Sequence, residues 1–244
     1  RDTDRSRGLG DVYKRQIQGK LESVLSQMTG EQIDVIGAGR TDAGVHAKGM
    51  AANAHMQTSM TPDEICDYMN RYLPEDICVM EVRIASERFH SRYNAVGKTY
   101  CYTCYVGDKK PVFNRKYVHI TGDVPDVEAM KKAASYLVGV HDFASFCSAN
   151  SQAQTTVRTI YDCTVSKAGD IITIRVTGNG FLYNMVRIMV GTLIFINEGK
   201  IGETQIPDIL ASKDRTRGGK TVPPQGLYLN EVYYDKDKGS EQGE

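Results

Sequence analysis

The sequence lacks the features that mark membrane, secreted or strongly basic nucleic-acid-binding proteins. It has no tryptophan, no signal-peptide pattern and no apolar run near the roughly 18 residues that a membrane-spanning helix needs. It also lacks net charge, because 30 Lys and Arg residues balance 30 Asp and Glu residues. We therefore expect a cytoplasmic protein with no membrane contact, in which any surface for nucleic acid is a local patch.

Cysteine is too sparse for a disulfide scaffold, with six residues in a chain of 244. Cys101 and Cys104 form the one close pair, and strand alternation would point their side chains to opposite faces. No second pair and no nearby histidine completes a zinc set. The sequence thus predicts free thiols in a reducing compartment and no metal site.

The most informative segment covers residues 36–50, with the sequence IGAGRTDAGVHAKGM. Four glycines among these fifteen residues permit sharp turns and the close approach of a ligand. Arg40 and Asp42 flank Thr41 in the middle. A strand-loop-strand frame that holds one carboxylate is a common way to present a reactive group. The structural alternative is an Asx turn at Asp42 with a solvated Arg40.

Residues 39–47, GRTDAGVHA, resemble the signature of the tRNA pseudouridine synthase A family. The unbroken nine-residue match is far more specific than an isolated pair of glycines. The resemblance implies that Asp42 is a nucleophile and that Arg40 helps to hold the target nucleotide after it leaves the base stack.

Residues 88–105 interleave cations with aromatic side chains, a composition that suits unpaired RNA. Taken alone, the aromatic alternation of residues 98–105 is more often plain sheet packing than an RNA surface, because tyrosine favours strands. The segments FHSRY and KTYCY resemble the second family motif, which implies that Tyr100 stacks on the target uracil and may assist removal of its C5 proton. Predicted contacts to phosphates from this region come from Arg88, His90, Arg92 and Lys98.

Two further motifs lie in the second half of the chain. Arg187 is the one cation in an otherwise apolar helix predicted over residues 184–197, where a charge is usually paired or snorkels to solvent. The match to the third family motif implies a pair with Asp42 that keeps the nucleophile ionised. PPQGLYL, residues 223–229, resembles the fourth motif and implies that Leu227 packs against the base. Lys213 and Arg215 lie in a basic loop, by default a solvated connector and here a further candidate for phosphate contacts.

Periodicity and capping signals predict most of the remaining elements. We expect a helix from Ile17 to Gly30 and a half-buried strand over residues 78–84. The capping box Thr61–Glu64 predicts a further helix, with Ile65, Met69 and Tyr72 on its inner face. A helix from about Asp126 should face Met130, Ala133, Ala134 and Leu137 inward, and residues 158–165 and 171–176 should form a hairpin. His141 beside Asp142 suggests a general base, but a structural pair next to two packed Phe rings is better supported.

The predicted organisation has four parts. Residues 1–16 are read as a non-native leader, 17–107 and 108–236 as N-terminal and C-terminal synthase domains, and 237–244 as a disordered tail. The family's usual first strand and Gly-Trp-Gln loop are missing from this chain. The resemblance implies an α+β fold of two ferredoxin-like units, whose antiparallel sheets join into one extended sheet with the active-site cleft between them.

The resemblance covers Ile17 to about Tyr234, with four motifs in family order. It implies an isomerase, a homodimer that binds the anticodon arm of tRNA and converts uridine to pseudouridine, at expected positions 38 to 40, without a metal or cofactor. The rival from another class is a non-catalytic RNA-binding module or RNA chaperone of the same fold. A glycosidase-like hydrolase is a remoter rival, because no motif supplies its second carboxylate.

Overall fold

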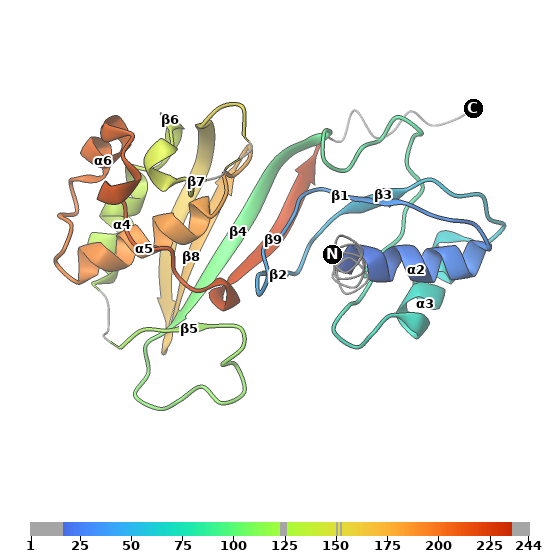
Figure 1. The fold of residues 1–244 in the computed structure, drawn as a ribbon. Helices are drawn as coiled ribbons and strands as arrows, with labels where there is room; N and C mark the ends of the chain where they lie inside the picture. Colours follow the sequence, from blue (N-terminus) through green and yellow to red (C-terminus); the bar gives the residue numbers. More distant parts are fainter. Residues whose placement is uncertain (1–16, 123–125, 150, 152, 236–244) are drawn as a thin grey trace, which may run out of the picture. The chain divides into compact units, whose positions relative to one another are not determined.

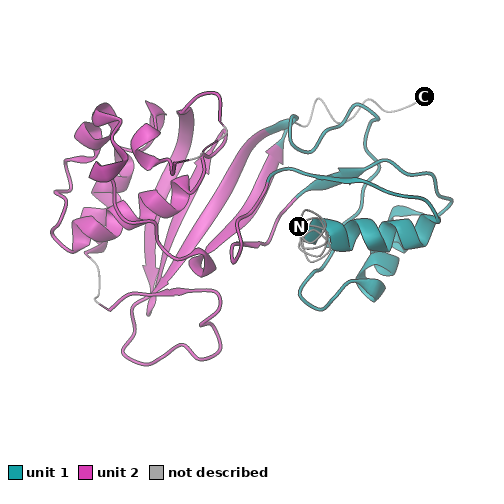
Figure 2. Ribbon diagram, viewed as in Figure 1, with its two compact units in different colours: residues 1–39, 51–95, 234–244 teal, residues 40–50, 96–233 magenta. Residues whose placement is uncertain are grey.

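The computed structural model describes residues 17–122, 126–149, 151 and 153–235 (Figure 1). The predictions for the leader, residues 1–16, and for the tail, residues 237–244, lie outside these described residues. Contacts divide the chain into two compact units (Figure 2). The first unit comprises Arg1–Gly39, Ala51–Ala95 and Tyr234–Glu244, and the second comprises Arg40–Met50 and Val96–Tyr233. The boundary between synthase domains after residue 107 is a different division and stays a prediction.

The described part of the first unit combines two helices with a two-stranded sheet. Helix α2 (Ile17–Thr29) and helix α3 (Pro62–Tyr72) flank strands β1 (Val35–Gly37) and β3 (Ala52–Ala54), which pair antiparallel. One buried cluster joins these elements, made of Val24, Leu25, Ile33, Val35, Ile65, Met69 and Leu73. Both predicted helices are confirmed, and the positive φ of Gly30, 77°, lets the chain turn away after α2.

The start of α3 is the predicted capping box. The Thr61 hydroxyl accepts from the Glu64 amide, and the Glu64 carboxylate accepts from the Thr61 amide at 2.8 Å. Ile65 and Met69 are buried as predicted, but the prediction that Tyr72 also faces inward is wrong, because its side chain is 48% exposed. Leu73 takes that place, because the chain leaves the helix there in extended conformation and turns the leucine into the core.

The strand predicted over residues 78–84 is wrong, because none of these residues belongs to a strand. Met80 is 80% and Ile84 is 88% exposed, so the alternating side chains do not form a buried face. A strand needs a partner for its backbone groups, and no described strand pairs with this segment. Asn70 of α3 satisfies the backbone instead, because its amide bonds both the Val79 N–H at 2.8 Å and the Val79 carbonyl at 2.7 Å.

The second unit is built on a seven-stranded mixed sheet (Figure 1). Its order is β2 (His46–Ala47), β9 (Leu227–Tyr234), β4 (Ala95–Tyr105), β8 (Ile171–Gly178), β7 (Val157–Ala168) and β6 (Gly139–Asp142), and β5 (His119–Ile120) also pairs with β4. The β4–β8, β7–β8 and β6–β7 pairs are antiparallel, whereas β2–β9 and β4–β5 are parallel. The predicted hairpin is confirmed as β7–β8, turning at Gly169 with a φ of 57°.

Helices complete the core of the second unit. They are α4 (Val127–Ser135), α5 (Met185–Asn197) and α6 (Ile206–Ser212), with short 3-10 turns η1 (Ala144–Phe146), η2 (Arg215–Arg217) and η3 (Pro224–Gly226). Helix α4 packs against β7 and α5, and the four side chains predicted to face inward from it are all buried, which confirms that prediction. Helix α5 is buried along most of its length, as its apolar sequence requires. Five described α-helices and a mixed sheet give the chain the predicted α+β class.

Candidate active site

The loop that carries Asp42 closes on itself in a tight turn. The Val45 amide donates to the Asp42 carbonyl at 3.0 Å, and Gly44 takes a φ of 81°, which a side chain would strain. A Cβ at Gly44 would also lie 3.0 Å from the Pro224 ring, so the turn packs directly against η3. Gly44 therefore allows the turn that carries Asp42 to pack closely against η3.

The outgoing end of this loop is tied to the last strand. β2 pairs parallel with β9, placing His46 opposite Tyr228 and Ala47 opposite Leu229, and the Lys48 amide donates to the Leu229 carbonyl at 2.8 Å. The loop is thereby fixed beside the start of β9, where Leu227 lies. Leu227 is 6% exposed and belongs to the main buried cluster, against which Val45 and Tyr100 also pack.

Arg187 approaches Asp42 from the first turn of α5. Its Nη1 lies 3.9 Å from the Asp42 Oδ2, which confirms the predicted ion pair, and the side chains are 15% and 41% exposed, respectively. This distance exceeds that of a hydrogen bond. The hydrogen bonds of the guanidinium go elsewhere: Nε donates to the Val222 carbonyl and Nη1 to the Asn184 Oδ1, each at 2.7 Å. Arg187 is thus rigidly held in Coulomb range of the carboxylate.

Residues 219–223, here called the strap, run against α5 and supply one of these anchors. A Cβ at Gly191 would lie 1.8 Å from the Lys220 carbonyl oxygen, so the two backbones are in direct contact. The Gly219 amide donates to the Thr192 hydroxyl at 2.8 Å, and the Tyr102 hydroxyl donates to the Pro223 carbonyl at 2.8 Å. The strap therefore delivers its Val222 carbonyl to Arg187 in a fixed position.

Tyr100 lies in β4 opposite Val176 of β8, with its ring edge-on to Phe181 at a centroid distance of 5.1 Å. Burial, with a further contribution from the charge of Asp42, raises the pKa of the Tyr100 phenol to about 12. A phenol with this pKa is neutral near pH 7. The dependence on Asp42 places Tyr100 within electrostatic reach of the carboxylate, so the structure brings Asp42, Arg187, Tyr100 and Leu227 together in one unit.

The residues predicted to bind RNA are divided between the two units. Arg88, His90 and Arg92 lie in the first unit, where the His90 Nδ1 accepts from the Arg92 amide at 3.2 Å and the His90 ring packs on Tyr93. Arg40, Lys98, Lys213 and Arg215 lie in the second unit, and Arg40 is exposed at the loop surface. Lys213 pairs with Asp142 at 2.9 Å and Arg215 donates to the Thr221 hydroxyl at 3.2 Å, so both already have partners within the chain.

His141 and Asp142 do not act on each other. The His141 Nε2 is 3.0 Å from the Val138 carbonyl, whereas the Asp142 carboxylate accepts from the Thr156 hydroxyl and the Ala144 amide and pairs with Lys213. These hydrogen bonds, led by that from Thr156, lower the pKa of the Asp142 carboxyl group. Phe143 and Phe146 are fully buried beside this corner. The geometry gives His141 a structural position, and among the described residues its ring nitrogen bonds only the Val138 carbonyl.

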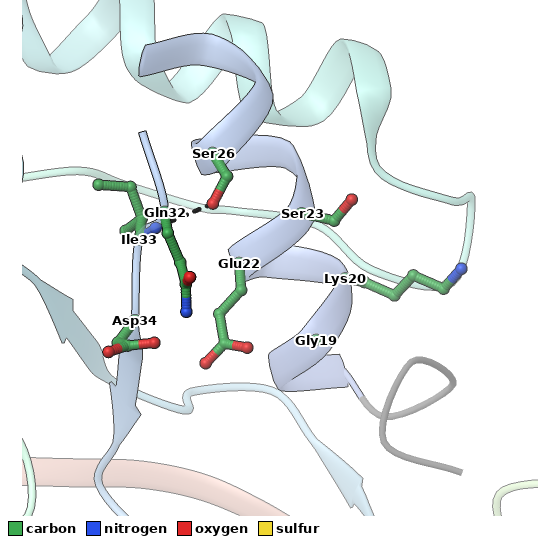
Figure 3. A pocket seen from close by; sticks show the side chains of 8 residues that line it. All are labelled: Gly19, Lys20, Glu22, Ser23, Ser26, Gln32, Ile33 and Asp34. Carbon is green, nitrogen blue, oxygen red and sulfur yellow. Dashed lines mark hydrogen bonds between the residues drawn. The ribbon is translucent and has the colours of Figure 1, made fainter. Parts of the chain in front are cut away.

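A separate pocket of about 490 Å³ lies in the first unit, between α2 and the segment before β1 (Figure 3). Its lining includes Lys20, Glu22, Gln32 and Asp34, and none of the predicted site residues. Within the described residues, no group of three or more metal-binding side chains is found, and no helix is long and apolar enough to cross a membrane.

Sequence reasoning missed two of the contacts that hold Arg187. Asn184 precedes it by three residues, a spacing at which helical side chains meet, so this contact had a readable signal. Val222 contributes a backbone carbonyl from 35 residues away, for which side-chain identity gives no signal.

Comparisons with known proteins agree with the geometry. A family model described as tRNA pseudouridine synthase matches residues 4–94 and 133–235. A tRNA pseudouridine synthase A of Bacillus sp. (strain KSM-64) is 48% identical over 219 residues, which cover 89% of each chain. The proteins of the same name from Thermoanaerobacter sp. (strain X514) and Caldicellulosiruptor bescii are 44% and 42% identical, with 89% and 91% of each chain covered.

Proposed function

The chain belongs to the tRNA pseudouridine synthase family, and we propose from this membership and the site geometry how it isomerises uridine to pseudouridine in tRNA. The carboxylate of Asp42 is the nucleophile and attacks either C1′ of the ribose or C6 of the uracil. The bond between N1 and C1′ breaks, the trapped base turns over, and C5 bonds to C1′. Asp42 is released as its carboxylate, displaced from C1′ by C5 on the first route or eliminated from C6 on the second. The C5 proton then leaves and N1 gains a proton, so the product is an isomer of the substrate.

The neighbours of Asp42 have separate roles in the reaction. Arg187 stabilises the negative charge of the carboxylate at 3.9 Å, and Tyr100 stacks on the base. The raised pKa of Tyr100 supports this packing role more than acceptance of the C5 proton by its phenolate. Leu227 closes the pocket against the base, and Arg40 at the exposed rim of the loop holds the nucleotide after it leaves the stack.

The observation that carries the proposal is the placement of one carboxylate. Asp42 lies on a loop fixed by the β2–β9 pairing, faces the anchored Arg187, and is sensed electrostatically by the Tyr100 phenol. A module that only bound RNA would have no use for an ion-paired carboxylate beside an aromatic ring, because that carboxylate repels phosphates.

The finer features of the proposal come from family resemblance. They are the anticodon arm as target region, with positions 38 to 40 as expected sites, a homodimer as the working form, and the cytoplasm as compartment. They also include the description of the fold as two ferredoxin-like units with joined sheets. Arg88, His90, Arg92, Lys98, Lys213 and Arg215 are proposed to contact the tRNA backbone.

The experiment maps pseudouridine along an unmodified tRNA after incubation with the protein. We expect new pseudouridine in the anticodon arm and none in a tRNA whose uridines there are replaced by cytidine. Pseudouridine confined to another region would refute the anticodon-arm assignment alone. Tight tRNA binding without any new pseudouridine would contradict the enzyme and favour the binding module.

A further inference from the structure

Asn184 has an unusual backbone for the first residue of a helix. It precedes α5 with a φ of 60°, one of two non-glycine residues with positive φ in the described chain, and its side chain makes no capping hydrogen bond. Asparagine tolerates this left-handed region better than most residues. A side chain at a helix start that does not cap the helix is available for another role.

The Asn184 amide is oriented by its partners. Arginine offers only donors, so the amide oxygen must be the atom that faces the Arg187 Nη1, at 2.7 Å. The amide nitrogen then points to the Ser148 hydroxyl and donates to it at 3.0 Å. Ser148 is itself fixed, because its backbone N–H donates to the Tyr183 carbonyl at 3.1 Å. A chain of hydrogen bonds therefore runs from the backbone through Ser148 and Asn184 to Arg187.

Two hydrogen bonds define the position of a planar guanidinium, and Arg187 has both. The Val222 carbonyl holds Nε and Asn184 holds Nη1. The same Nη1 stands 3.9 Å from the Asp42 Oδ2. Two phenols of β4 interact electrostatically with this ion pair. Burial and then the charge of Asp42 raise the pKa of Tyr100, whereas burial raises the pKa of Tyr102 against an opposing effect of Arg187.

We propose that Asn184 is a positioning residue that holds Arg187 within Coulomb range of Asp42 but outside hydrogen-bond distance. A direct charge-assisted hydrogen bond would occupy a lone pair of the carboxylate and weaken it as a nucleophile. Without any nearby cation, the negative charge of the carboxylate would lose its Coulomb stabilisation. Asn184 therefore balances charge stabilisation of the carboxylate against its nucleophilicity. This inference rests on the proposed role of Asp42.

Two substitutions of Asn184 should lower the single-turnover rate while leaving tRNA affinity near that of the parent. Asn184→Gly keeps the left-handed backbone but frees Nη1 to form a hydrogen bond with Asp42, which would occupy a lone pair of the nucleophile. Asn184→Asp keeps the shape but adds a second carboxylate at Nη1, which would compete with Asp42 for the guanidinium charge. We expect each substitution to lower the rate by roughly tenfold.

Asn179→Asp is the matched control, because it adds the same charge in the turn before α5 while its amide oxygen faces the Thr159 N–H. It should leave the single-turnover rate unchanged. Thermal unfolding of each variant would confirm that it is folded. Single-turnover rates of both Asn184 variants equal to that of the parent, or a fall in rate matched by an equal loss of tRNA affinity, would overturn the positioning role. If the parent makes no pseudouridine, the proposed function itself fails, so the two failures are distinguishable.

Discussion

At the scale of single residues, Arg187 connects the parts of the candidate site. Its side chain links the start of α5, the strap and the loop that carries Asp42 through contacts with Asn184, Val222 and Asp42. Each hydrogen bond from a charged donor contributes roughly 1.5–3 kcal/mol, so the position of the guanidinium is well defined. The ion pair with Asp42 is the longest of the three contacts, which leaves the carboxylate accessible to a substrate.

The buried Tyr100 phenol should make the stability of the protein depend on pH. Its pKa is raised to about 12 when folded, against about 10 when unfolded, so the unfolded chain loses its proton first as pH rises. Stability should therefore be unaffected by this group below about pH 10 and should fall as pH rises towards about 12, by up to about 3 kcal/mol. Urea unfolding of Tyr100→Phe should show a smaller fall over this range than the parent. An identical fall in both proteins would contradict the burial of the phenol.

At the scale of elements, local sequence signals predicted the helices. They did not predict the features that depend on contacts between segments far apart in the sequence. The capping box at Thr61 and the buried face of α4 could be read from a few neighbouring residues. The segment 78–84 alternates like a strand, but Asn70 satisfies its backbone and no described strand pairs with it. In the site, the motifs predicted the meeting of Asp42 and Arg187, whereas the strap's carbonyl could be seen only in the structure.

Because α5 contacts the strap, Gly191→Ala should lower the stability of the protein, although alanine favours a helix more than glycine does. Alanine favours a helix over glycine by about 1 kcal/mol, but a Cβ at Gly191 would collide with the Lys220 backbone. We expect Gly191→Ala to destabilise the fold by about 1–3 kcal/mol, as overpacking does, and to reduce activity by displacing the Val222 carbonyl from Arg187. Chemical denaturation and a pseudouridine assay measure the two effects.

Gly122→Ala is the control for this prediction, because no atom of the described residues lies within 4 Å of its added Cβ and its φ lies outside the left-handed region. Its stability should stay within about 0.5 kcal/mol of the parent. A Gly191→Ala protein as stable as the parent would show that the strap does not lie against the helix.

At the scale of the whole molecule, zero net charge makes tRNA binding depend on local cations. Exposed Arg92 should contribute one phosphate contact. Arg92→Ala should therefore make the negative slope of log affinity against log salt shallower by about one. Lys213→Ala should change it less, because that ammonium already pairs with Asp142. Binding titrations at several salt concentrations test both, and equal slopes for Arg92→Ala and the parent would remove Arg92 from the interface.

The central claim is that the Asp42 carboxylate is the nucleophile, and one substitution tests it most directly. Asp42→Asn keeps the size of the side chain and removes its charge and its nucleophilic oxygen. Single-turnover pseudouridine formation on unmodified tRNA should fall by at least about a thousandfold, while tRNA affinity stays near that of the parent. An Asp42→Asn protein that still formed pseudouridine at a rate close to that of the parent would contradict the account.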